Sequence, residues 1–261
     1  GGRDKDGNGG NQATAFSGTF DGQGHRIYGM VCSDTDNMFK NYTALFGVLL
    51  DSKIRNLSVD GNVTAYANAS ILVGSLGTYG TSSVVLNCNV SGTINAFVKN
   101  SVGALIGSAY CGTIYNCSTN CIIRTNNSQY RSALLGGFDS TLVTVVNCCW
   151  NAETIEQPIG DNFVNCYAIP ANNTVDYAEK LNDVMIEGAV KWVMGEDGYP
   201  TLDFNDRVQN WINVAELVAP VDGVYYIDKP EQLAYIAKIA NEGNTLEGKT
   251  VLLRNDLDLS G

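Results

Sequence analysis

The sequence predicts an all-β fold, a parallel β-helix in which short strands stack in successive coils. The first observation behind this prediction is a repeat: five asparagines occupy the same place in five copies of one short pattern, at separations of 31, 29, 31 and 18 residues. A repeat of about thirty residues is typical of a solenoid. The five residues are Asn56, Asn87, Asn116, Asn147 and Asn165.

The second observation is the spacing of apolar residues around each asparagine. An apolar residue stands two positions before it and Leu or Cys one position after it, as in V-L-N-C around Asn87. Inward residues of a straight strand are two apart, but here they are three apart. The chain therefore turns a corner at the asparagine, which tolerates the left-handed backbone conformation better than other non-glycine residues. Stacked corners predict a ladder of side-chain amides, each hydrogen-bonded to the next.

The third observation is an apolar run that ends in glycine at the start of each coil. A strand bearing the asparagine follows each run, and a further strand, such as 121–125, follows the asparagine. Three short strands in about thirty residues fit a triangular coil. The runs are A-L-F-G at 44–47, I-L-V-G at 71–74, A-L-I-G at 104–107 and A-L-L-G at 133–136.

Two later segments depart from the coil pattern. Apolar residues at near-helical spacing predict a helix over 174–187, which with the strand that follows would close the C-terminal end of the coil. The parallel β-helix with this cap would span 1–206, and 207–222 would be a connector.

Residues 223–261 are predicted to form a helix with flanking strands. Asp228 is the expected N-cap, proline lies in the first turn, and Gly243 ends the helix. Because a coil without a cap exposes strand edges and an open apolar core, we expect this segment to cap the N-terminal end of a coil. Self-capping and a head-to-tail swap between chains are both open.

Composition excludes several classes of partner. The net charge of −11 argues against nucleic acid, which needs a basic face, and against an anionic membrane surface. No run of eighteen apolar residues exists, so no membrane insertion is expected.

Four of the eight cysteines directly follow a ladder asparagine. We expect them to stack as small buried side chains, with disulfides between coils as the alternative.

Asp4, Asp6 and Asn8 match the first half of a calcium loop, D-x-D-x-N-G, and are the candidate metal site. The glutamate expected at the twelfth position is absent, because residue 15 is alanine. A flexible acidic turn is therefore the alternative to a calcium site. No other cofactor is expected.

No set of residues is nominated as catalytic. Asp21 lies beside Gly22, Gly24 and His25, where we expect a tight turn in which the aspartate bonds backbone amides. Glycoside hydrolysis needs two converging carboxyl groups, and the coil region 44–150 shows no repeated acidic pair. The acidic residues of this region are Asp51, Asp60 and Asp139. The same region contains tyrosines that could stack on sugar rings, namely Tyr66, Tyr79, Tyr110 and Tyr130.

Taken together, the motifs resemble those of GLUG-repeat proteins, a group of bacterial surface proteins named for the repeat in IgA-cleaving metalloproteases. The resemblance implies a right-handed β-helix of the pectate-lyase-like type, exported to the bacterial cell surface. In that family the helix and the D-L-D-L-S-G strand normally precede F-S-G-T-F-D-G, whereas here they come last. The matching pieces are F-S-G-T-F-D-G-Q-G-H-R-I-Y-G at 16–29, the glycine-ended runs, the N-C strands, G-Y-P-T-L at 198–202, Y-Y-I-D-K-P-E-Q-L-A-Y-I-A at 225–237 and N-D-L-D-L-S-G at 255–261.

The expected function is therefore a non-catalytic adhesion or interaction module, or a structural spacer, within a secreted or surface-displayed bacterial protein. Host or dietary glycans or glycoproteins are the expected partners. The alternative is a carbohydrate-active β-helix enzyme or a glycan-binding module.

Overall fold

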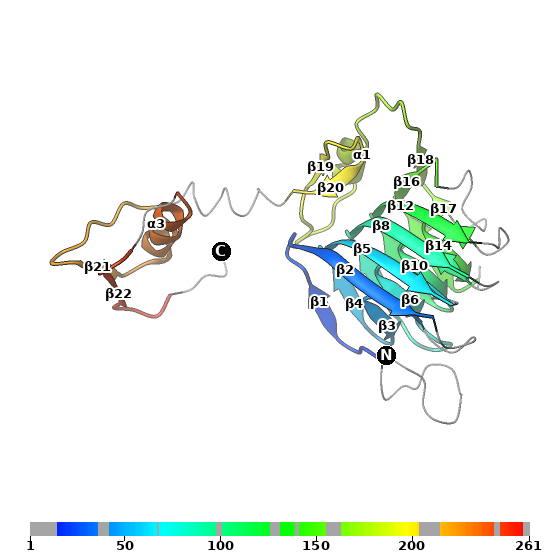
Figure 1. The fold of residues 1–261 in the computed structure, drawn as a ribbon, viewed down its shortest axis with the longest axis horizontal. Helices are drawn as coiled ribbons and strands as arrows, with labels where there is room; N and C mark the ends of the chain where they lie inside the picture. Colours follow the sequence, from blue (N-terminus) through cyan, green and yellow to red (C-terminus); the bar gives the residue numbers. More distant parts are fainter. Residues whose placement is uncertain are drawn as a thin grey trace. The chain divides into compact units, whose positions relative to one another are not determined.

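The first of two compact units is a right-handed parallel β-helix, which confirms the predicted fold class (Figure 1). The units are Gly1–Asp203 and Phe204–Gly261. The computed structural model describes residues 15–35, 42–66, 68–97, 101–125, 131–138, 141–154, 163–203, 215–242 and 246–257.

Each complete coil contains three strands joined at corners. β1 (Thr19–Asp21) and β2 (Arg26–Asp34) precede the complete coils, and β17 (Phe163–Val164) and β18 (Tyr167–Ile169) follow them. The complete coils of the described residues are β3 (Phe46–Leu49), β4 (Lys53–Arg55) and β5 (Ser58–Ala65); β6 (Val73–Leu76), β7 (Val84–Leu86) and β8 (Asn89–Ala96); β10 (Ile106–Ala109), β11 (Gly112–Tyr115) and β12 (Ser118–Thr125); and β14 (Leu135–Phe138), β15 (Val143–Val146) and β16 (Cys149–Asn151).

Equivalent strands of successive coils pair in parallel and form three sheets. Sheet A has the order β3-β6-β10-β14, sheet B the order β1-β4-β7-β11-β15-β17, and sheet C the order β2-β5-β8-β12-β16-β18. The register is continuous over eight residues in β5, β8 and β12, so that Asn62, Thr93 and Ile122 share one row across sheet C.

In the four complete coils the interior contains the residues that the spacing placed there, whereas Phe163 and Cys166 of the fifth copy are only partly buried. Ile54, Val85, Ile114 and Val145, each two positions before a corner asparagine, are all fully buried. Leu57, Cys88, Cys117 and Cys148, each directly after the asparagine, are buried in the same core cluster. Apolar burial of this kind is the dominant stabilising term of such a fold.

The glycines that end three of the four apolar runs, Gly74, Gly107 and Gly136, are required by close approach of neighbouring parts of the chain. Short parallel pairings link Thr43, Ala69 and Val102, and β9 (Val102–Gly103) pairs with β13 (Arg131–Ser132), beside the start of sheet A. A Cβ atom on Gly136 would lie 2.4 Å from the backbone nitrogen of Val102. Any larger residue there would force the stacked chains apart.

The segment 176–202, here called the flank segment, lies along the side of the coil rather than only across its C-terminal end. It contains α1 (Tyr177–Asn182), β19 (Trp192–Met194) and β20 (Pro200–Leu202), with β19 and β20 antiparallel. The predicted helix is confirmed but short, and Asp176 caps it by accepting from the backbone N–H of Glu179. Its buried residues, Ala178, Leu181, Val190, Trp192 and Leu202, form one cluster with Cys149 and Ile169 of the coil.

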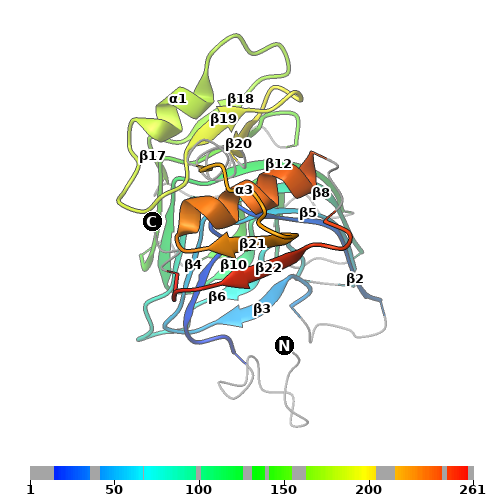
Figure 2. The same cartoon turned by 90° about the vertical axis from the view of Figure 1, so that its left-hand side faces the viewer.

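The second unit is a small α/β arrangement. β21 (Val224–Ile227) and β22 (Thr250–Leu253) pair in parallel, and α3 (Pro230–Asn241) connects them and lies over the pair (Figure 2). Proline begins the helix as predicted, but Lys229 is the N-cap. The side chain of Asp228, the expected cap, instead pairs with Arg254. Gly243 lies outside the described residues, and the capping role expected for 223–261 stays a prediction.

We expect Gly136→Ala to lower the free energy of unfolding by about 1–3 kcal/mol, the usual cost of overpacking a closely packed site. The added methyl group would meet backbone atoms, which cannot rotate away. Gly18→Ala is the matched control, because its Cβ would meet only Phe16 Cζ, at 3.7 Å. Chemical denaturation that gave both variants equal stability would contradict this account of the glycine runs.

Candidate functional site

All five repeat asparagines adopt the left-handed backbone conformation, which confirms the predicted corner. Their φ angles are 53° at Asn56, 51° at Asn87, 54° at Asn116, 53° at Asn147 and 52° at Asn165. Asparagine is among the few non-glycine residues that adopt this conformation at low cost. The corners are therefore encoded by local backbone preference.

The side chains of three corner asparagines form a buried hydrogen-bonded ladder. Asn87 Nδ2 donates to Asn56 Oδ1 at 2.9 Å, and Asn116 Nδ2 donates to Asn87 Oδ1 at 3.0 Å. If the Asn116 amide is turned over, its nitrogen instead donates to the carbonyl oxygen of Leu181 at 3.2 Å, and amide orientation of this kind is an assignment. For Asn147 and Asn165 the corner is confirmed, and their membership in the ladder stays a prediction.

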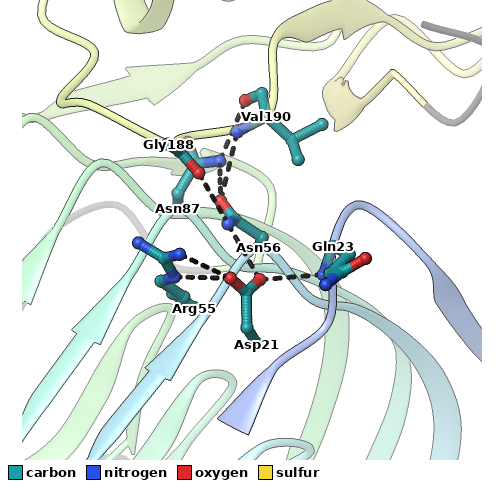
Figure 3. A network of polar contacts seen from close by, with 7 residues as sticks. All are labelled: Asp21, Gln23, Arg55, Asn56, Asn87, Gly188 and Val190. Carbon is teal, nitrogen blue, oxygen red and sulfur yellow. Dashed lines mark hydrogen bonds and ion pairs between the residues drawn. The ribbon is translucent and has the colours of Figure 1, made fainter. Parts of the chain in front are cut away.

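The flank segment supplies the remaining partners of the ladder (Figure 3). Asn56 Nδ2 donates to the carbonyl oxygen of Gly188 at 2.9 Å, and Asn56 Oδ1 accepts from the backbone N–H of Val190 at 3.1 Å. Asn87 Nδ2 donates to the carbonyl oxygen of Val190 at 2.9 Å, and Trp192 Nε1 donates to Asn87 Oδ1 at 2.7 Å. Asn56 Oδ1 thereby accepts two hydrogen bonds, and Asn87 Nδ2 donates two.

Asp21 provides the acceptor at the N-terminal end of the ladder (Figure 3). Its Oδ1 accepts from Asn56 Nδ2 at 3.0 Å and from the backbone N–H of Gln23 at 2.9 Å, as expected for a turn aspartate. Its Oδ2 lies 2.6 Å from both Nε and a terminal nitrogen of Arg55, a partner that sequence reasoning missed. Burial raises the pKa of Asp21, but the bonds from Asn56, Gln23 and Arg55 outweigh it, so the pKa is lowered from its usual value.

The turn after Asp21 is structural. Gln23 and Gly24 both have positive φ, and the backbone N–H of His25 donates to the carbonyl oxygen of Gly22 at 2.8 Å. A Cβ atom on Gly22 would lie 2.6 Å from the carbonyl oxygen of Asn56. Glycine is therefore needed where this turn packs against the next corner.

The cysteines are free thiols; of the four that follow corner asparagines, Cys88, Cys117 and Cys148 are buried as expected, whereas Cys166 is only half-buried. The backbone N–H of Cys117 lies 3.4 Å from Cys148 Sγ, and that of Cys148 lies 3.4 Å from Cys166 Sγ. Burial raises the pKa of Cys117 and Cys148, so these thiols stay protonated at neutral pH. Disulfides between coils, the alternative from the sequence, are not formed.

The coil carboxylates bind their own neighbours. Asp51 Oδ1 accepts from the backbone N–H of Ser82 at 2.8 Å, and Asp60 Oδ2 accepts from Ser91 Oγ at 2.7 Å. Within the described ranges no group of three or more His, Cys, Asp or Glu is placed to hold a metal ion. The calcium candidates Asp4, Asp6 and Asn8 lie outside those ranges, as does Asp139.

The outer face of sheet C presents polar side chains in rows that cross the strands. In one row, Ser91 donates to Asp60, and Asn151 Nδ2 donates to Asn120 Oδ1 at 2.9 Å. The loop between β19 and β20 borders this row, because Asn120 Nδ2 donates to Asp197 Oδ2 at 2.8 Å. Neighbouring rows carry Asn62, Thr93 and Ile122, and Thr64, Asn95 and Arg124.

Large exposed side chains lie on the strands of this face. The exposed fraction is 81% for Tyr28, 75% for Val31 and 54% for Ile122. Tyr28 was not among the predicted tyrosines, which were drawn from the coil region 44–150; it lies on β2 next to a register shift between Ile27 and Met30. Of those predicted, Tyr79 and Tyr110 are exposed and Tyr66 is half-buried, while Tyr130 lies outside the described residues.

Comparisons with known proteins leave the family open. No family model matches the chain, and no curated protein and no solved structure matches it either. Within the described residues, no helix has the length and apolar character needed to cross a membrane.

We expect Asn87→Ala to lower the free energy of unfolding by at least about 3 kcal/mol, since it leaves several buried donors and acceptors unpaired at about 1–3 kcal/mol each. The groups affected include Trp192 Nε1 and the carbonyl oxygen of Val190. Asn62→Ala, on the exposed face of β5, should change stability by less than about 0.5 kcal/mol. Equal losses in urea denaturation would refute the structural role of the ladder.

Asp21→Asn should cost most stability near neutral pH and progressively less in acid. The pKa of Asp21 is lowered in the folded protein, so its charged form stabilises the fold above the unfolded pKa of about 3.9. That contribution disappears as pH falls through the lower, folded pKa. Denaturation curves of both proteins between neutral pH and strong acid should therefore converge, and a constant gap would count against the Asp21–Arg55 pair.

Proposed function

We propose that this protein is a non-catalytic interaction module that binds a glycan or glycoprotein through the outer face of sheet C. The observation that carries the proposal is the arrangement of that face. Rows of Asn, Ser and Thr side chains run across strands in continuous register, with Tyr28 exposed on β2. Amides and hydroxyls match the hydrogen-bonding groups of sugars, and an exposed aromatic ring can stack on a sugar ring.

Rigidity supports a recognition role for this face. The coil positions its side chains through backbone pairing in every strand and through buried corner amides, so little conformational entropy is lost on binding. Loops of comparable composition would have to be ordered by the ligand. The same stacking of coils also suits a spacer that holds other domains away from a surface.

Display on a bacterial surface is part of the proposal. It rests on the resemblance of the motifs to those of GLUG-repeat proteins. An exported protein of this kind would meet host or dietary glycans directly.

A carbohydrate-active enzyme is the second candidate, favoured by acidic groups beside the polar row. Burial raises the pKa of Tyr199, and the negative charges of Glu153 and Asp197 raise it further. Two carboxyl groups that flank a bound sugar are the usual requirement for glycoside hydrolysis.

Retention on an array of host and dietary glycans and mucins tests the main proposal. Tyr28→Ala should weaken binding roughly 2- to 10-fold, the equivalent of about 0.5–1.5 kcal/mol for one aromatic contact. Tyr79→Ala is the matched control, since Tyr79 is 71% exposed but lies between sheets A and B. The same loss in both variants, or no retention of the unchanged protein, would reject the sheet C face.

Assay of reducing ends released from the same glycans separates the two candidates. Retention without release is the result expected of an interaction module. Release that Asp197→Asn abolishes would establish the enzyme instead.

A further inference from the structure

The outer face of sheet C has two halves that differ in how their polar side chains are used. In the half that borders the loop between β19 and β20, Ser91 donates to Asp60 at 2.7 Å and Asn120 donates to Asp197 at 2.8 Å. These side chains already bond to one another or to the flank segment. A ligand in this half would have to replace bonds that the protein makes itself.

The other half, here called the distal half, consists of two rows whose polar side chains are left for a ligand. Each row crosses β5, β8 and β12 in continuous register, and its side chains are exposed or half-buried. Among the described residues, none of these side chains has a hydrogen-bonding or ionic partner. The two rows are Asn62, Thr93 and Ile122, and Thr64, Asn95 and Arg124.

Arg124 gives the distal half a positive charge without a counter-charge. The only other cation on the described strands of sheet C is Arg26, which lies 3.9 Å from the carboxylate of Asp60. Arg124 is exposed on β12 and Ile123 before it is buried, so the Arg124 side chain points outward. Its guanidinium group is therefore available to an anionic ligand.

Neighbouring carboxylates do not neutralise Arg124. Asn120, which bonds to Asp197, precedes Arg124 by four residues on the same strand, so their rows are about 13 Å apart. Asp34 is on β2, three strands away from β12, or about 14 Å. Both separations exceed the Debye length of about 8 Å at physiological ionic strength. Among the described residues no carboxylate forms an ion pair with Arg124, and this includes Glu153.

We propose that Arg124 makes the distal half of sheet C selective for glycans that carry a carboxylate group. The proposal rests on the glycan binding proposed above and names the class of glycan. A planar guanidinium donates two parallel hydrogen bonds to a carboxylate, which a neutral sugar does not offer. Asn95 and Thr64, in the same row, offer an amide and a hydroxyl to the adjoining sugar. A sulfated sugar shares the negative charge, so the two anions have to be tested separately.

The affinity of the full chain for three related sugars tests the selectivity. Sialyllactose carries a carboxylate, sulfated lactose carries a sulfate ester, and lactose is neutral. We expect NMR titration to show sialyllactose binding at least about 10-fold more tightly than lactose, the contribution of one charge-assisted hydrogen bond. Sulfated lactose should bind more weakly than sialyllactose. Equal or tighter binding of sulfated lactose would overturn the assignment to carboxylates.

Substitution of Arg124 tests whether this residue is the source of the selectivity. Arg124→Gln should bring the affinity for sialyllactose close to that for lactose and leave the affinity for lactose within about 2-fold. Arg124→Lys keeps the charge but loses the paired donors, so it should retain only part of the preference. Lys191→Gln is the matched control, because it removes an exposed cation from the flank segment, outside sheet C. The control should leave both affinities unchanged.

The outcomes separate this inference from the glycan binding on which it rests. Equal binding of lactose and sialyllactose, binding of neutral glycans alone, or no effect of Arg124→Gln would overturn the selectivity and leave a glycan-binding face. Failure of the unchanged protein to retain any glycan, charged or neutral, would reject both. Because Arg124 is exposed, its substitution should leave the urea midpoint of unfolding unchanged.

Discussion

The structure of the coil depends on the hydrogen bonding of primary amides buried at successive corners, those of Asn56, Asn87, Asn116 and Asn147. A buried amide without partners would cost more than the corner gains. Asn56 and Asn87 each bond both to the neighbouring coil and to the flank segment, through the backbone of Gly188 and Val190 and the Trp192 side chain. The same set of bonds therefore fixes the corner, the stacking register and the position of a segment more than a hundred residues away.

This dual role explains how much of the fold could be predicted from sequence. The corner, the inward residues on both sides of it and the glycine-ended runs are local patterns that recur in each coil, and all are confirmed. The position of the flank segment was not predictable in the same way. Apolar residues at helical spacing show that one face is buried, but they do not say against what. The bond from Asn56 to Gly188 spans 132 residues and leaves no periodic signal.

The candidate site was less predictable than the fold because its main features depend on register. The polar row from Asp60 to Ser91 and Asn120 exists only because β5, β8 and β12 align without slippage. Tyr28 projects from β2 beside an irregularity that the amino-acid pattern does not reveal. The pairing of Asp21 with Arg55 likewise needs adjacent strands, although both residues stand at recognisable places next to a turn and a corner.

The ladder also has a direction. Asn87 donates to Asn56 and Asn56 to Asp21, so these two amide dipoles point the same way, with the donor end toward the first strands. A carboxylate accepts but, when ionised, cannot donate, so Asp21 ends the chain of bonds as an anion at its positive end. Coils can thus be gained or lost in evolution between Asp21 and the later corners while every ladder hydrogen bond keeps the same donor-to-acceptor direction. Growth past Asp21 would require a new terminator.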